Sequence, residues 1–163
     1  MIFSLPSPFN KSELIAKNQS VDDIAKLICR GIKESKNNAK FLLKHLEKNN
    51  TRATCYAIWK FLKNNVEYKK EGSNFQSVKT ISRLLIKDKF GDCKHFATCT
   101  GAILKACNIP FVIRLVGFQF GSDMPTHVYI VAFDEQKEPV YIDCVLNRFD
   151  SEPSYKFKKD IVC

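Results

Sequence analysis

The sequence predicts an α+β fold in which helices come first, an antiparallel sheet follows, and one central helix packs on that sheet. Apolar residues recur at helical spacing up to about residue 107. From residue 111 onward they gather in short runs of β-branched and aromatic residues. Turns of about five residues join these runs, which is typical of antiparallel neighbours. The chain has 163 residues, of which 45% are hydrophobic, so we expect a single domain with its own core.

Four helices are expected before the central one, after an extended lead-in over residues 1–11. Ser20, followed by two aspartates, can cap the first helix. A polar stretch over residues 35–38 is expected to separate it from the second. Thr51 and Ser77 are suitable caps for the third and fourth. The expected bounds are 20–32, 39–46, 51–64 and 77–86.

The central helix is expected to begin at Cys93. Gly91 and Asp92 bring the chain into this residue, and a segment rich in small and apolar residues follows. Such a helix can lie close to other backbone, so we expect it to be buried. Asn108 suits the left-handed position after a helix, and Pro110 prevents continuation.

Three strands and a C-terminal tail follow the central helix. The strands are expected at 111–118, 126–133 and 140–145. Residues 147–163 are polar and aromatic and are expected to wrap over the surface as a tail. Within the single domain we distinguish an N-terminal helical segment (1–50), a core (51–150) and a tail (151–163).

Three residues form a candidate catalytic set. A cysteine in the first turn of a helix, as Cys93 is expected to be, is a poised nucleophile, because the free N–H groups and the helix dipole favour a thiolate. His127 opens the second strand and Asp143 lies in the third, so neighbouring strands can bring base and carboxylate together. His95 is an alternative base, although it lies only two residues along the helix from Cys93 and points away from it.

The cysteine pattern predicts neither a disulfide framework nor a metal site. The seven cysteines are an odd number, and no C-x-x-C motif occurs. Most thiols are expected to be buried as small hydrophobic groups. Cys93, His95 and Cys99 could be mistaken for the start of a zinc site, but no second ligand pair follows at the required spacing. We therefore expect no metal and no cofactor.

The net charge of +9 is interpreted as a solvated basic surface. The lysines are scattered, and no long basic run is interleaved with aromatic residues, although attraction to nucleic acid stays open. No apolar run approaches the ~20 residues that span a bilayer. The start of the chain lacks a basic region and meets Pro6 early, so we expect no signal peptide, no membrane association and a cytoplasmic location.

Five blocks of the sequence resemble the transglutaminase-like superfamily of papain-type cysteine enzymes over about residues 51 to 150. The blocks are Gly91-Asp92-Cys93, Asn108-Ile109-Pro110, Arg114, Thr126-His127-Val128-Tyr129 and Tyr141-Ile142-Asp143. The chain also resembles the short members found in bacteriophages and Bacteroidetes. In these members the Asp block continues as it does here in Val145-Leu146 and Phe149-Asp150-Ser151-Glu152-Pro153.

The resemblance implies a Cys-His-Asp triad made of Cys93, His127 and Asp143. It also implies a polar residue ahead of the cysteine that stabilises an oxyanion, and Gln76 is the matching position. Cys144 departs from the pattern, because proline often stands there in the superfamily. This second thiol suggests the hypothesis of oxidation with Cys93.

The implied function is acyl transfer on the amide bonds of a peptide or protein, by hydrolysis or by transamidation. The chain lacks the extra domains and acidic loops of the calcium-dependent transglutaminases, so the family name does not decide the reaction. Two alternatives are a phage virion or assembly protein that keeps the fold and contacts other structural proteins, and a basic nucleic-acid-binding module. A phage-encoded protein would act in the host cytoplasm or in the virion.

Overall fold

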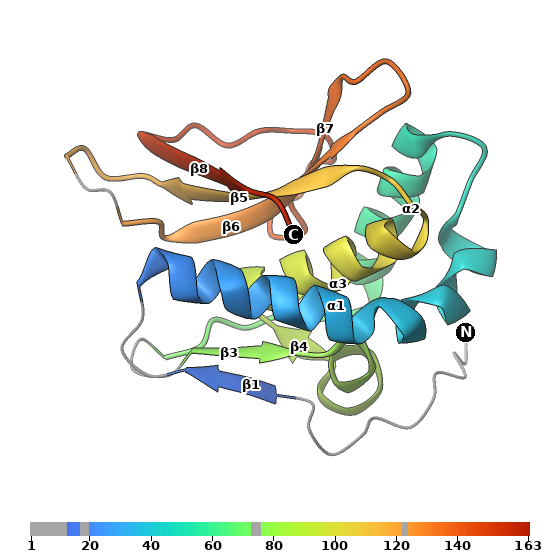
Figure 1. Ribbon diagram of the computed structural model, residues 1–163, viewed down its shortest axis with the longest axis horizontal. Helices are drawn as coiled ribbons and strands as arrows, with labels where there is room; N and C mark the ends of the chain where they lie inside the picture. The colour runs from blue at the N-terminus through green and yellow to red at the C-terminus, as the bar shows by residue number, and fades with distance from the viewer. Residues whose placement is uncertain (1–12, 17–19, 73–75, 122–123) are drawn as a thin grey trace.

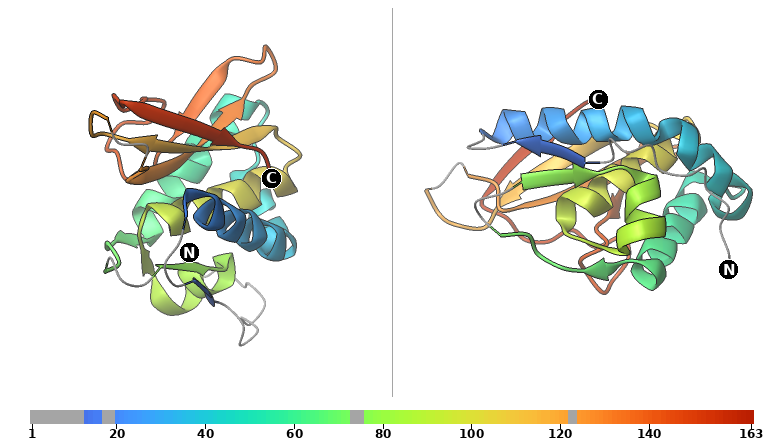
Figure 2. Two further views of the ribbon diagram at one scale, coloured as in Figure 1. Left: turned by 60° about the vertical axis from the view of Figure 1, so that its left-hand side comes forward. Right: turned by 90° about the horizontal axis from the view of Figure 1, so that it is seen from below.

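The computed structural model describes residues 13–16, 20–72, 76–121 and 124–163 and has the expected α+β architecture. Helix α3 (Cys93–Ala106) lies in the middle, with a four-stranded antiparallel sheet on one side and α1 (Val21–Leu46) beside it (Figures 1 and 2). The expected lead-in over residues 1–11 lies outside the described residues. The remaining helical elements are α2 (Thr51–Asn65) and a six-residue π-helix, η1 (Arg83–Asp88).

Helix α1 is continuous, so the predicted break over residues 35–38 was wrong. Ser35 is fully buried, and its hydroxyl accepts a hydrogen bond from the Ile81 N–H at 3.1 Å. Asn38 donates to the Ser82 hydroxyl at 2.7 Å. These polar residues are therefore helical contacts to the segment after β3 (Gln76–Lys79), and their local preference for turns is overridden by tertiary structure. Ser20 caps the helix as expected.

Two short strand pairs lie near the start of α3. Strand β3 pairs antiparallel with β1 (Glu13–Ala16). Strand β2 (Glu67–Tyr68) pairs parallel with β4 (Phe90–Gly91), immediately before α3. The prediction that Ser77 caps a helix over 77–86 was wrong. Ser77 belongs to β3, and its hydroxyl donates to Glu71 at 2.6 Å. The cap of α2 is Asn50, one residue before the predicted Thr51.

Helix α3 begins and ends where the sequence predicts. Asp92 is its N-cap, and Asn108 adopts a left-handed conformation (φ 57°) just after its end. The helix is buried along nearly its whole length. A Cβ atom placed on Gly101 would lie 2.5 Å from the Ile32 side chain, so this glycine permits the close packing of α3 against α1.

The main sheet has the strand order β7-β6-β5-β8. Its strands are β5 (Phe111–Gly117), β6 (His127–Phe133), β7 (Pro139–Ile142) and β8 (Phe157–Ile161). The expectation of a surface tail was wrong for β8, which pairs antiparallel with β5 at the edge of the sheet. Asp143 was predicted inside the third strand, whereas β7 ends one residue before it. The division of the domain at residues 50 and 150 stays a prediction.

The structure contains a disulfide between Cys29 and Cys163, a pairing that the cysteine pattern did not predict. It links α1 to the end of the chain across a sequence separation of 134 residues, with the Cα atoms 5.3 Å apart. Counting cysteines cannot reveal that α1 and the C-terminus are neighbours. Cys55, Cys99 and Cys144 are buried, as the sequence predicts for most thiols. Cytoplasmic location stays a prediction, and disulfides persist mainly in oxidising compartments.

Within the described residues, no helix is both long enough and apolar enough to span a membrane.

Candidate active site

Cys93 is the first residue of α3, and its thiol is half-buried. The preceding residue holds this end of the helix in place. The Asp92 carboxylate accepts a hydrogen bond from the Lys94 N–H at 3.1 Å, and the Asp92 N–H donates to His95 Nδ1 at 3.0 Å. These reciprocal bonds form a capping box around the candidate nucleophile.

A buried cluster of charged residues lies around this capping box. Burial raises the pKa of Asp92, but hydrogen bonding to His95 and the charge of Lys94 outweigh it and bring the pKa to about 2. The Lys94 ammonium contacts the Asp92 carboxylate and lies 3.6 Å from Glu71. His95 is fully buried and its Nε2 is 3.5 Å from the Ser77 hydroxyl. The contacts of His95 are thus with the support of the helix start, which makes it a poor candidate for the base.

The side chains of His127 and Asp143 lie within hydrogen-bond distance of each other. The distance from His127 Nε2 to Asp143 Oδ2 is 2.6 Å, and the other carboxylate oxygen of Asp143 accepts from the Val145 N–H at 3.0 Å. The Cys93 thiol is a further hydrogen-bond partner of the imidazole. Because Nε2 is engaged by the carboxylate, Nδ1 is the nitrogen available to the thiol.

The electrostatics of this group favour a protonated imidazole. Burial lowers the pKa of His127, but the hydrogen bonds to Asp143 and Cys93, together with their charges, raise it to about 9. A proton on this ring would stabilise a thiolate on Cys93, as in activated cysteine nucleophiles. The arrangement can therefore hold a thiolate–imidazolium pair.

Aromatic rings pack against His127 and near the start of α3. Phe118 stacks on the His127 ring with centroids 6.1 Å apart, and Tyr129 lies on it at 5.8 Å. Tyr68 on β2 stacks on Phe96 of α3, one turn from the thiol. Burial and the charges of Cys93, Asp92 and Asp143 raise the pKa of Tyr68. Sequence reasoning missed these rings, because aromatic residues are equally common in hydrophobic cores.

Gln76 is the first residue of β3 and is half-buried. Its neighbour Ser77 lies beside His95, so β3 runs close to the start of α3. The oxyanion assignment for Gln76 stays a prediction.

The remaining candidates carry little chemistry. Burial raises the pKa of Cys144 to about 12, so its thiol is a poor partner for oxidation with Cys93. In the part of the chain that the structure describes, no three His, Cys, Asp or Glu side chains are grouped so that they could hold a metal ion.

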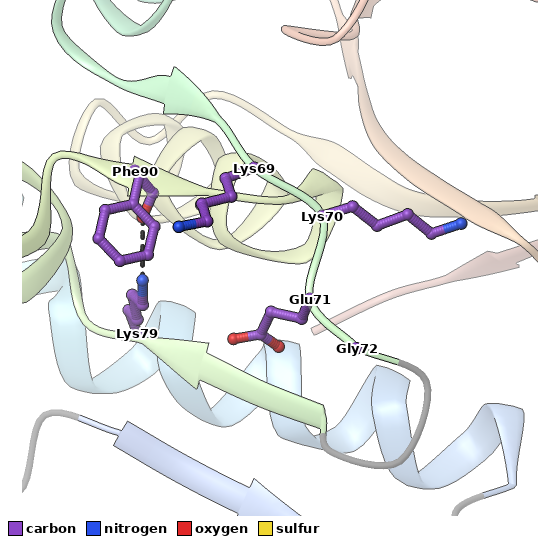
Figure 3. Close-up of a pocket in the computed structure, with 7 residues that line it drawn as sticks. Lys69, Lys70, Glu71, Gly72, Lys79 and Phe90 are labelled. Carbon is purple, nitrogen blue, oxygen red and sulfur yellow. Dashed lines mark hydrogen bonds between the residues drawn. The ribbon is translucent and has the colours of Figure 1, made fainter.

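A cavity of about 280 Å³ lies near the start of α3 (Figure 3). Lys69 and Lys79 direct their ammonium groups to the Phe90 ring, at 5.0 and 4.0 Å from its centroid. Tyr68 faces α3, whereas the next residue, Lys69, faces Phe90. Because successive residues of an extended chain point to opposite sides, this cavity lies across the β2–β4 pair from the Tyr68 ring.

The central helix packed on an antiparallel sheet has the arrangement of a transglutaminase-like core. The model of a family described as "Transglutaminase-like domain" matches residues 37–142, well over half of the sequence. The chain therefore belongs to the transglutaminase-like family. The match includes Cys93 and His127 and stops one residue before Asp143. A search of curated proteins finds no significant match.

Several solved structures share the fold at low sequence identity. A candidate cysteine protease from Cytophaga hutchinsonii is 21% identical, with a TM-score of 0.52 over 81% of this chain and 48% of that chain. A candidate protease from Parabacteroides distasonis is 16% identical, with a TM-score of 0.53 over 74% and 25% of the two chains. The periplasmic domain of TgpA from Pseudomonas aeruginosa is 16% identical, with a TM-score of 0.51 over 74% and 49%. The chain thus spans between a quarter and a half of the length of these proteins. Its assignment to the phage type stays a prediction.

Proposed function

We propose that this protein is a cysteine-dependent acyl-transfer enzyme that acts on amide bonds of peptides or proteins. The observation that carries the proposal is the arrangement of the Cys93 thiol at a helix start, beside an imidazole that is itself hydrogen-bonded to Asp143. Each of these features occurs alone in proteins without catalytic function. Together they supply a nucleophile, a base beside it and a carboxylate that orients the base.

The proposed mechanism has two steps. The Cys93 thiolate attacks the carbonyl carbon of the amide, and the His127 imidazolium then donates its proton to the leaving amine as the C–N bond breaks. The thioester that remains on Cys93 is attacked by water or by a second amine, whose proton passes to His127. Water gives hydrolysis and an amine gives transamidation. The Cys93 N–H and the Gln76 side chain would stabilise the oxyanion, and one such donor is worth ~3 kcal/mol in known cases.

The first experiment measures the reactivity of individual cysteines with iodoacetamide at pH 7, read out by mass spectrometry of peptides. Cys107 is a matched control, because it is also free and half-buried and burial raises its pKa to about 11. Cys93 should react more than about tenfold faster than Cys107, and His127→Ala should remove this advantage. Equal rates for the two cysteines in the wild-type protein would contradict the proposal.

The second experiment tests the reaction itself. The protein is incubated with a mixture of unstructured peptides and a fluorescent primary amine. New peptide amino termini indicate hydrolysis, and incorporation of the fluorescent amine indicates transamidation. Both should be abolished by Cys93→Ala and retained by Cys107→Ala. An activity that survives Cys93→Ala would assign the chemistry to another group.

A further inference from the structure

Asp143 is not held in place by the sheet. The last paired residues of β6 and β7 are Ile130 and Ile142, so Asp143 lies just beyond the ladder. Its backbone carbonyl instead accepts a hydrogen bond from the indole N–H of Trp59 at 3.0 Å. Trp59 lies on α2 and is 84 residues away in sequence. The main chain of the carboxylate residue is thus fixed by a helix outside the sheet.

One face of α2 is attached to the segment around Asp143. Arg52 pairs with Asp134 and Asp150, and Lys63 Nζ donates to Asn147 Oδ1 at 2.9 Å. The helix residues that make these contacts and the Asp143 contact are Arg52, Trp59 and Lys63. Separations of seven and eleven residues return to nearly the same angle on an α-helix. The three side chains therefore project from one face, and the indole contact lies between two charged attachments.

Neighbouring rings pack against the indole of Trp59. Tyr56 stacks on Trp59 with centroids 6.1 Å apart and an interplanar angle of 23°, and Phe149 lies against it at 6.0 Å. The Lys63 ammonium lies 5.9 Å from the Trp59 ring centroid. Packing alone would be satisfied by a ring without a polar atom. An indole adds a single donor and no acceptor, and here that donor reaches the carbonyl of Asp143.

We propose that Trp59 is a positioning residue for the reaction. By holding the Asp143 carbonyl, it keeps the carboxylate in line with His127 Nε2. This inference rests on the proposed function, since it assigns Trp59 a role only through Asp143 and His127. Trp59 does not contact the reacting atoms, and neither the motif blocks nor the candidate triad includes it.

The first test uses the unmodified protein. Trp59 is the only tryptophan in the chain, so its indole N–H gives a single assigned signal in a ¹H–¹⁵N spectrum. We expect this N–H to be protected from exchange with solvent. We also expect its chemical shift to change with pH at the same midpoint as the His127 ring signals. An indole N–H that exchanges as fast as that of a free peptide, or that does not respond to the titration, overturns the proposal.

The second test compares two variants. Trp59→Phe keeps a ring but removes the donor, and Tyr56→Leu removes a stacking ring but keeps the donor. With Trp59→Phe, the pKa of His127 measured by NMR should fall by about 0.5 to 1, and iodoacetamide labelling of Cys93 at pH 7 should slow about two- to tenfold. With Tyr56→Leu, the thermal midpoint should fall while the pKa of His127 stays within error of the wild type.

The outcomes separate positioning from packing. If both variants move the pKa of His127 equally, Trp59 is merely structural and the proposal is wrong. If Trp59→Phe does not fold, the titration of the indole signal in the wild-type protein still decides. If Cys93 is no more reactive than Cys107, the proposed function fails, but the pKa of His127 still reports on Trp59 independently.

Discussion

Asp143→Asn should remove most of the upward shift in the pKa of His127. Asparagine has nearly the same shape as aspartate but carries no charge. The ordinary pKa of histidine is 6.5, and in this site the ring is held at about 9. That gap corresponds to about 3 kcal/mol in favour of the imidazolium. Burial is the largest influence on the ring and opposes this preference, so the carboxylate is required to overcome it.

The expected result for Asp143→Asn is a pKa of His127 below about 7. The assay is an NMR titration of the His127 ring signals, with the iodoacetamide rate of Cys93 measured on the same samples. Labelling of Cys93 at neutral pH should slow, because the thiolate loses its charged partner. Asp22→Asn is a matched control, because this exposed aspartate is paired with Lys159. If His127 keeps a pKa above about 8 in Asp143→Asn, the carboxylate is not what raises it.

The same substitution should alter the dependence of stability on pH. Because the folded-state pKa of His127 is raised above its unfolded value, its contribution to stability is fully present below pH 6.5 and is lost as the pH rises through about 9. The free energy of unfolding of the wild type should therefore fall between pH 7 and 9 relative to that of Asp143→Asn. Urea unfolding at these two pH values measures the difference, and parallel curves would contradict the assignment.

Three further perturbations follow from the fold. Reducing the Cys29–Cys163 bond, or replacing Cys29 by serine, should lower the free energy of urea unfolding by up to about 5 kcal/mol, because the closed loop is long. An unchanged unfolding midpoint after reduction would show that the bond does not form in solution. Gly101→Ala should destabilise the protein by about 1–3 kcal/mol, since the new Cβ would lie 2.5 Å from the buried Ile32 side chain. A thermal melt equal to that of the wild type would mean that α1 and α3 can separate freely. Asp92, whose pKa is held at about 2, contributes stability that is present above pH 3.8 and lost as the pH falls through about 2. Asp92→Asn should remove about 2 kcal/mol of this acid dependence. An acid-unfolding curve identical to that of the wild type would refute this prediction.

Local sequence signals were sufficient to predict an element where neighbouring residues alone decide its conformation. The start of α3 was predictable because Asp92 is a strong N-cap, and its end because Asn108 tolerates a left-handed backbone. The strands β5 and β6 were predictable from their β-branched and aromatic composition. The candidate residues Cys93 and His127 followed from their positions at the first residues of such elements.

Local signals failed where a distant contact outweighed a local preference. Ser35 would favour a turn in isolation, yet it is helical because its hydroxyl meets Ile81 from another segment. Ser77 would favour a helix cap, yet it lies in a strand, where Glu71 accepts a hydrogen bond from its hydroxyl. β8 carries two adjacent lysines, Lys158 and Lys159, in a polar stretch that resembles a surface tail, and pairing with β5 makes it a strand.

By itself, the sequence determined the class of fold, the start of the central helix and a cysteine placed there with a histidine on a later strand. These features depend on capping, periodicity and composition, which act over a few neighbouring residues. Only the tertiary structure decided that His127 contacts both Asp143 and Cys93, that Trp59 holds the Asp143 carbonyl, and that Cys29 meets Cys163. These contacts join residues up to 134 positions apart, and the energy that selects them comes from packing the whole core.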